Sequence, residues 1–290
     1  MAEAPISVVI PCFNEESAIL DVLAGVAHKI EGMGREFEIV VVDDGSTDGT
    51  PARLKTSRVP IRIIRHRSNR GYGASLKDGI RAAVHDYVLV MDGDGQHSPD
   101  DIPALLAEAE EYDMVVGARQ GQGSHYWRMP GKYILKKLCE FLVGARIPDV
   151  NSGFRLFRKS EAARYMQLCS DEFSFSTSIT LAFLSARLSV RFVPVSARAR
   201  QGGRSLVTFG TGFATLMLIL RIIGTFNPLP IFMPPTVLLF FTGLTYAGWG
   251  VWYQSSIPKG AVICLLASVF FFCFGLMADQ LALIRREINK

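Results

Sequence analysis

Residues 87–97 read YVLVMDGDGQH, a short apolar run followed at once by two acidic residues. A continuous apolar run of this length is typical of a buried parallel strand. Asp92 and Asp94 stand two positions apart and offer carboxylate oxygens, and Gln96 adds an amide oxygen. Such oxygens suit Mg²⁺ or Mn²⁺, with coordination positions left for phosphate. The stretch predicts a strand that ends in a metal-binding turn, and a plain Asp-Gly turn is the alternative.

Strand and helix patterns alternate on both sides of this stretch. Strand patterns occupy residues 6–10, 38–42, 61–65, 114–117 and 190–194, and helical patterns occupy residues 14–30, 50–57, 71–84, 99–111 and 175–188. Alternation at this density predicts an α/β fold with a doubly wound, mostly parallel sheet. Ligands of such sheets bind beyond the carboxyl ends of the strands, where Asp92 and Asp94 stand.

A second acidic cluster, DDGSTDGT at residues 43–50, follows the predicted strand at residues 38–42. One interpretation is an Asx-rich turn that caps the next helix through Ser46 or Asp48. The other is a carboxylate that accepts a hydrogen bond from the N–H of a nucleotide base in the same crevice. Both interpretations can hold together if different residues of the cluster cap the helix and bind the base.

The apolar residues concentrate at the C-terminal end of the chain. The sequence has 290 residues, of which 49% are hydrophobic, with 31 Lys and Arg and 27 Asp and Glu. Beyond Asn227 the charged residues are only Lys259, Asp279, Arg285, Arg286, Glu287 and Lys290. Residues 235–253 and 261–278 are uncharged, and each run is long enough to cross a bilayer as a helix. A buried core hairpin is the alternative for this pair.

The basic residues around the two predicted spans indicate an orientation. Residues 254–260 permit only a tight turn, so both ends of the hairpin lie on one side of the membrane. Arg285, Arg286 and Lys290 follow the second span, against Lys259 alone in the turn. Because positive charge is retained inside, we expect an integral membrane protein with both termini cytoplasmic.

These patterns divide the chain into three parts. Residues 206–225 are apolar apart from Arg221, which predicts an amphipathic interfacial helix. We therefore expect a cytoplasmic domain at residues 1–205, an interfacial segment at residues 206–228 and a transmembrane hairpin at residues 229–290.

Composition argues against several other classes. A net charge of +4, without interleaved aromatic and basic residues, gives no support for nucleic acid binding. The five cysteines show neither CxxC nor Cys/His spacing, so a disulfide framework or a zinc site is not expected. The first strand is followed by PCFNEE rather than GxGxxG, which removes the main support for a dinucleotide-binding enzyme.

The motifs at the strand ends together resemble those of the family 2 glycosyltransferases. They are PCFNEE at residues 11–16, DDGSTDGT at 43–50, NRGYGAS at 69–75 and DGDGQH at 92–97. The resemblance covers residues 6–117 and implies a GT-A fold. The later segments NSGFRLFRKS and RQGGRS, with the apolar tail, resemble the dolichol-phosphate mannosyltransferase branch and its bacterial polyprenyl-phosphate relatives.

This resemblance implies which residues bind the donor. Pro11, Asn14 and Glu15 would line the nucleotide pocket, with Asp43 and Asp44 at the base and the ribose. The residues that would hold a Mg²⁺ or Mn²⁺ ion against the diphosphate are Asp92, Asp94 and Gln96.

On the acceptor side, the resemblance implies that Arg119 and Arg200 grip phosphate. Arg204 and Ser205 belong to the same motif as Arg200. Lys132 stands near a position where the family has an Arg, and Asp149 matches an acidic position near the acceptor site. The catalytic group would then comprise Asp94, Arg119, Lys132, Asp149 and Arg200.

The implied reaction is an inverting transfer of a hexose from GDP-mannose or UDP-glucose to a polyprenyl or dolichyl phosphate in the membrane. A phosphate monoester is already largely anionic at pH 7, so no strong general base is required. Two alternatives stay open, a family 2 enzyme with a hydroxyl acceptor and a catalytically silent membrane scaffold of the same fold. The QxxRW motif typical of the former is absent from the sequence. Whether the chain forms a homo-oligomer also stays open.

Overall fold

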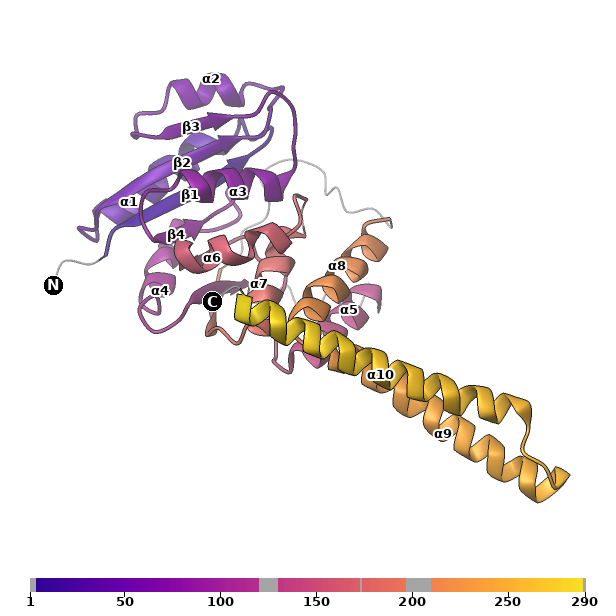
Figure 1. Ribbon diagram of the computed structural model, residues 1–290. Helices are drawn as coiled ribbons and strands as arrows, with labels where there is room; N and C mark the ends of the chain where they lie inside the picture. The colour runs from indigo at the N-terminus through magenta and orange to yellow at the C-terminus, as the bar shows by residue number, and fades with distance from the viewer. Residues whose placement is uncertain (1–3, 120–129, 173, 197–209, 289–290) are drawn as a thin grey trace.

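The computed structural model of the chain describes residues 4–119, 130–172, 174–196 and 210–288, and it contains one seven-stranded sheet (Figure 1). Its strands are β1 (Ile6–Cys12), β2 (Phe37–Asp43), β3 (Arg62–Arg65), β4 (Tyr87–Val90), β5 (Met114–Arg119), β6 (Arg155–Arg158) and β7 (Val190–Val195). They lie in the order β3-β2-β1-β4-β6-β5-β7. β6 is antiparallel to both of its neighbours, and the other pairs are parallel. The predicted mostly parallel α/β sheet is confirmed.

Helices cover both faces of the sheet because successive strand residues point to opposite sides. On one face, Val8 and Ile10 of β1 pack in a core with α1 (Ile19–Glu31) and α4 (Ile102–Leu106). On the other face, Val9 packs in a core with α3 (Tyr72–Ala82) and α7 (Phe175–Ser185). The remaining elements of this domain are α2 (Thr50–Lys55), α6 (Lys159–Tyr165), α5 (Pro130–Val143) and the 3₁₀ turns Pro99–Asp101 and Met166–Leu168.

Two predicted helices have different bounds in the structure. The helix predicted from residue 14 begins only at Ile19, because Asn14 has a left-handed φ of 57° and its Oδ1 accepts a hydrogen bond from the backbone N–H of Thr47. The helix predicted over residues 99–111 ends at Leu106. There the N–H groups of Glu108 and Ala109 bond to carbonyls three residues back, which tightens the backbone into turns.

One edge of the sheet collects the ends of six strands and the start of the seventh. All strands except β6 run in the same direction and end there. Because β6 is antiparallel, it begins at this edge, where Arg155 pairs with both Val90 and Val116. The chain between Arg119 and Arg155 therefore leaves and returns at the same edge.

A third core joins this domain to the C-terminal part of the chain. It contains Cys139 and Leu142 of α5, Leu181 of α7, and Ile219 and Ile222 of α8 (Gly210–Phe226). α8 lies within the segment predicted to be interfacial, and its buried residues pack against α5 and α7. Residues 206–209 lie outside the described residues.

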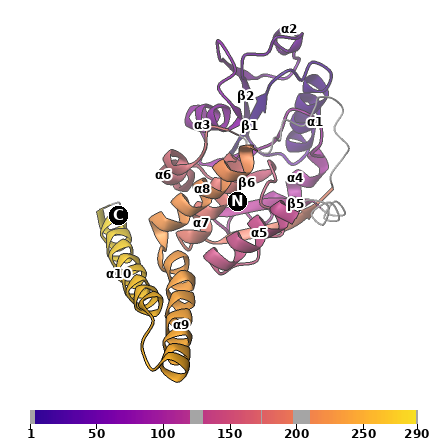
Figure 2. The same cartoon turned by 90° about the vertical axis from the view of Figure 1, so that its right-hand side faces the viewer.

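The C-terminal helices form an antiparallel hairpin that projects from the domain (Figures 1 and 2). They are α9 (Leu229–Gln254) and α10 (Lys259–Ile288), joined by a turn in which Ser255 has a left-handed φ of 51°. Both have the length and composition of membrane spans. In the most apolar 18-residue stretch of α9 only 11% of the residues are buried, and in that of α10 only 17%. The two helices therefore do not form the buried core of a water-soluble fold.

Candidate active site

The DGDGQH turn follows β4 at the edge where the strands end, as predicted. Its first carboxylate, on Asp92, is held on two sides. The hydroxyl of Tyr72 donates to Oδ1 at 2.8 Å, and His97 Nε2 lies 3.5 Å from Oδ2. His97 is itself buried and stacks on Phe154, with ring centroids 5.2 Å apart. Asp92 is therefore fixed in place by residues from α3 and from its own turn.

The protonation states of this group follow from its surroundings. Burial opposes the charge of Asp92, but the hydrogen bonds from His97 and Tyr72 outweigh it and lower the pKa of the carboxyl below its ordinary value. Burial and the nearby Asp92 charge raise the pKa of Tyr72 well above its ordinary value. At neutral pH Asp92 is ionised and Tyr72 is a proton donor.

Asp94 and Gln96 form the second half of the turn. The backbone N–H of Gln96 donates to Asp94 Oδ1 at 3.0 Å, and its side-chain amide donates to Oδ2 at 2.9 Å. Gln96 therefore orients the Asp94 carboxylate, and its amide oxygen is a further hard donor in the same turn.

These oxygens fit a Mg²⁺ or Mn²⁺ ion that is shared with a substrate. Among the described residues, no three His, Cys, Asp or Glu side chains converge on one point as a protein-only cage would. Mg²⁺ in particular is usually held by one or two carboxylates, with waters and substrate phosphates completing its coordination. Asp94 and Asp92, both half-buried, match that arrangement.

Asp43 ends β2 at the same edge of the sheet, separated from β4 by β1, and is fully buried. Its Oδ1 accepts a hydrogen bond from the backbone N–H of Ser46 at 2.9 Å. Its Oδ2 lies 3.2 Å from Arg65 Nε and accepts no hydrogen bond from any residue that the structure describes. A buried carboxylate oxygen of this kind is suited to accept an N–H of a nucleotide base.

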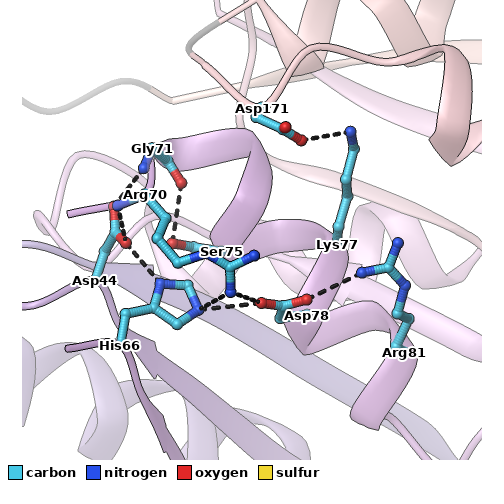
Figure 3. A network of polar contacts seen from close by, with 9 residues as sticks. All are labelled: Asp44, His66, Arg70, Gly71, Ser75, Lys77, Asp78, Arg81 and Asp171. Carbon is cyan, nitrogen blue, oxygen red and sulfur yellow. Dashed lines mark hydrogen bonds and ion pairs between the residues drawn. The ribbon is translucent and has the colours of Figure 1, made fainter. Parts of the chain in front are cut away.

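Asp44 has a different environment (Figure 3). Its Oδ1 lies 2.6 Å from His66 Nδ1 and accepts the Arg70 N–H, and its Oδ2 accepts the Gly71 N–H at 2.9 Å. His66 Nε2 in turn faces Asp78 at 3.1 Å. Asp44 thus anchors the start of α3 to β2, and its predicted contact with a ribose stays a prediction.

Asn14, which was predicted to line the nucleotide pocket, joins the loops after β1 and β2. Its backbone N–H donates to Ser46 Oγ at 3.0 Å, while its Oδ1 accepts from Thr47. The backbone N–H of Glu15 donates to Thr50 Oγ1, at the start of α2. Pro11 is buried in β1, in register with Val42. The predicted pocket residues therefore lie together on the β1–β2 side of the edge.

Arg119 and Asp149 form a bidentate pair on the opposite side of the edge. Arg119 Nε donates to Asp149 Oδ2 at 2.7 Å and Nη2 donates to Oδ1 at 3.1 Å. Burial opposes the charge of Asp149, but the hydrogen bond and the charge of Arg119 outweigh it and lower the pKa of that carboxyl. The structure therefore brings together the two described members of the predicted acceptor group.

Residues of the NSGFR segment complete the site. A Cβ atom on Gly153 would collide with the carboxylate of Asp92, so any other residue there would have to displace that carboxylate. Arg155 is fully buried, and its guanidinium donates to the carbonyls of Ser152 and Ser176 and, at 3.2 Å, to Thr180 Oγ1. Burial lowers the pKa of Arg155, but it is a guanidinium and stays charged.

Tyr72, Gly153 and Arg155 are the site residues that the sequence patterns did not identify. Each stands in a quoted motif, GYG or NSGFR, but nothing local to either motif indicates that it faces Asp92. Of the other predicted residues, Arg200, Arg204 and Ser205 lie outside the described residues. Lys132 is described only by its backbone position in α5.

Two protein-family descriptions match the chain. Residues 7–165 match glycosyl transferase family 2, and residues 227–284 match the GtrB C-terminal hairpin. Because the first match covers more than half of the 290 residues, the chain belongs to glycosyl transferase family 2. It is a family 2 glycosyltransferase with a GtrB-type C-terminal hairpin.

Solved structures show the same fold. Glucosyl-3-phosphoglycerate synthase from Mycobacterium tuberculosis, in complex with Mn²⁺, UDP-glucose and phosphoglyceric acid, is 22% identical with a TM-score of 0.62. The alignment covers 76% of this chain and 80% of that one. The complex of the same enzyme with phosphoglyceric acid is 23% identical, with a TM-score of 0.61 and the same coverage. The predicted GT-A fold is confirmed.

Proposed function

We propose that this glycosyltransferase transfers a hexose from a nucleotide-sugar to a polyprenyl or dolichyl phosphate, with inversion, to give a lipid-linked monosaccharide. The proposal rests on the presence, in one chain, of a GT-A site and an exposed apolar hairpin of the GtrB type. A hairpin inserted in a bilayer holds the catalytic edge near the membrane surface, where the phosphate of a lipid acceptor lies.

The donor is GDP-mannose or UDP-glucose. Asp43, with its buried Oδ2 atom, is the residue that would select the base, and Pro11, Asn14 and Glu15 would surround the nucleotide. The resemblance of the segments NSGFRLFRKS and RQGGRS to the dolichol-phosphate mannosyltransferase branch favours mannose as the sugar. The complexes of the mycobacterial relative with UDP-glucose support the alternative donor.

Asp94, Gln96 and Asp92 would hold Mg²⁺ or Mn²⁺ in this proposal, as the oxygen donors of the turn permit. The bound ion neutralises charge on the diphosphate as it leaves. Mn²⁺ in the complexes of the mycobacterial relative supports this cofactor. Tyr72 and His97 fix Asp92, so the turn is ordered before the donor arrives.

In the transfer step, an oxygen of the acceptor phosphate attacks the anomeric carbon as the bond from that carbon to the nucleoside diphosphate breaks. Both phosphates are anions, so the protein must attract and orient them. Arg119, held by Asp149, would bind the acceptor phosphate together with Lys132, Arg200, Arg204 and Ser205.

An open apolar groove supports a lipid acceptor. It has a volume of about 480 Å³ and lies between α5 and the first turns of α9. Phe141 of α5 forms one wall, and Met233, Val237 and Phe241 of α9 form another. A polyprenyl chain in this groove would run down the hairpin, while its phosphate stays near the catalytic edge.

The proposed cellular arrangement has residues 1–205 in the cytoplasm as the catalytic domain. Residues 206–228 lie at the membrane surface, and residues 229–290 form the transmembrane hairpin.

The test uses the full chain purified in detergent, with Mn²⁺ or Mg²⁺, a polyprenyl phosphate, and radiolabelled GDP-mannose or UDP-glucose in separate reactions. We expect one donor to yield a chloroform-soluble glycolipid. Asp94→Asn should abolish its formation, while Asp21→Asn, an exposed carboxylate on α1, should not. Transfer only to hydroxyl acceptors, or no glycolipid with any nucleotide-sugar, would overturn the proposal.

A further inference from the structure

A polar cavity lies where the hairpin meets the catalytic domain. Its volume is about 290 Å³, close to the lower end of the roughly 300–1,000 Å³ of small-molecule pockets. Ser185 and Arg187 line it from α7 and the turn after it, Asn227 from the end of α8, and Asp279 from α10. None of these residues belongs to the candidate active site.

The cavity lies at the level of the membrane surface if the hairpin is inserted. A helix crosses the hydrocarbon core in about 20 residues, and from Lys259 at the start of α10 that length reaches Asp279. α9 begins at Leu229, two residues after Asn227. Both helices therefore place this cavity among the lipid head groups on the catalytic side.

Two polar groups in the cavity have no partner among the residues that the structure describes. Ser185 is 8% exposed, and its buried Oγ makes no hydrogen bond to any residue that the structure describes. Within the same described ranges, no ion pair joins Asp279 to a basic side chain, although Arg187 lines the same cavity. Because buried polar atoms in proteins are almost always hydrogen-bonded, this cavity is suited to hold a polar ligand.

Helix ends give the cavity a preference for positive charge. α5 ends at Val143, α7 at Ser185 and α8 at Phe226, and all three residues line the cavity. The C-terminal end of a helix carries partial negative charge. With the Asp279 carboxylate and Ser185 Oγ, these helix ends make the cavity suited to an ammonium group.

We infer that this cavity binds the phosphoethanolamine head group of a membrane lipid. Its ammonium would donate to Asp279 and Ser185 Oγ, and its phosphate would pair with the exposed Arg187. A quaternary ammonium has no N–H to donate, and an anionic head group without an amine would be repelled by Asp279. The bound lipid ties α10 to α7 and α8 at the membrane surface.

This inference rests on the proposed membrane insertion but not on the proposed acceptor. The test is native mass spectrometry of the full chain, titrated with phosphatidylethanolamine, its N-methylated derivatives, phosphatidylcholine and phosphatidylglycerol of the same acyl chains. We expect phosphatidylethanolamine to bind tightest, and affinity to fall with each added methyl group. Equal binding of phosphatidylethanolamine and phosphatidylcholine, or preference for phosphatidylglycerol, would overturn the inference without the need for any variant.

Two variants locate the site. Asp279→Asn and Ser185→Ala should each reduce the preference for phosphatidylethanolamine over phosphatidylcholine by about tenfold, the change expected for one lost hydrogen bond to a charged group. Asp21→Asn, far from the cavity on α1, should keep the preference. A preference that survives Asp279→Asn would place the lipid elsewhere and overturn the assignment. Glycolipid synthesis is measured separately, so failure of the proposed function does not affect these results.

Discussion

Gly153 and Asp92 lie so close together that a Cβ atom on residue 153 would collide with the Asp92 carboxylate. Asp92 follows the end of β4, and Gly153, 61 positions later, precedes the start of β6. The two residues meet because β6 runs antiparallel to β4. The first carboxylate of the acidic turn is therefore enclosed by Tyr72, His97 and the backbone of Gly153.

Gly153→Ala should displace Asp92 and reduce activity strongly. A misplacement of about 1 Å in a catalytic arrangement can reduce the rate by roughly a hundredfold, and we expect a loss of that order in kcat/KM. Gly248→Ala is the matched control, because no atom lies within 4 Å of a Cβ at that helical position. Full activity of Gly153→Ala would show that Asp92 need not hold its observed position.

Tyr72→Phe should shift the pH dependence of the reaction. The phenol hydrogen bond helps to lower the pKa of Asp92, so its removal raises that pKa. The acid limb of the profile of kcat/KM against pH should then move to higher pH, with a roughly tenfold lower rate at pH 7. Tyr87→Phe, a half-buried tyrosine of β4, is the control. An unchanged acid limb would contradict the assigned hydrogen bond.

Asp44→Asn should destabilise the protein even without a donor. Asp44 now accepts hydrogen bonds from three donors, and the amide N–H₂ of an asparagine would face one of them. We expect a loss on the order of 2 kcal/mol and a melting temperature several degrees lower. Glu36→Gln, an exposed carboxyl, serves as the control. If only the KM for the donor changed, Asp44 would be a ribose ligand and not an anchor of α3.

Asp149→Asn should reduce stability in a pH-dependent way. The pKa of Asp149 is lowered in the folded state, so its ionised form contributes stability above the unfolded pKa, near 3.8, and this contribution is lost as pH falls through the folded value. The wild type should exceed the variant by on the order of 2 kcal/mol at pH 7, and the difference should shrink below about pH 4. A constant difference across this range, measured by denaturant unfolding in detergent, would contradict the ion pair.

Cysteine labelling tests the orientation of the hairpin. In a Cys264→Ser, Cys273→Ser background, Ser256→Cys in the turn should react with a membrane-impermeant maleimide in intact spheroplasts. Ala52→Cys, exposed on α2, should react only after lysis. Burial raises the pKa of the remaining thiols Cys139 and Cys169 to about 12, and that of Cys12 further, so they should stay unlabelled. The opposite pattern would place the catalytic domain outside.

Local sequence patterns were sufficient for the sheet and for the placement of Asp43 and Asp92. Short continuous apolar runs mark buried parallel strands, and parallel strands end at one edge of the sheet. The uncharged C-terminal runs likewise predicted the hairpin, since their length and composition are local properties.

Contacts between distant segments were not predictable in this way. The meeting of Tyr72, Asp92 and Gly153 depends on the order of strands and on the reversed direction of β6, which no local pattern encodes. The anchoring of Asp44 by His66 was missed for the same reason. The late start of α1 was missed because left-handed backbone at Asn14 is stabilised by a loop more than 30 residues away.

The route of the chain between β5 and β6 has an evolutionary consequence. It departs at Arg119 and re-enters at Arg155 on one edge, so insertions or replacements within it leave the strand register unchanged. This same segment carries Asp149 and the α5 wall of the apolar groove, while the residues proposed to bind the donor lie on or just after β1, β2 and β4. If the acceptor binds as proposed, exchanging this segment between relatives, together with the residues of α7 and α8 that pack against α5, should exchange acceptor preference while the donor half of the enzyme is retained.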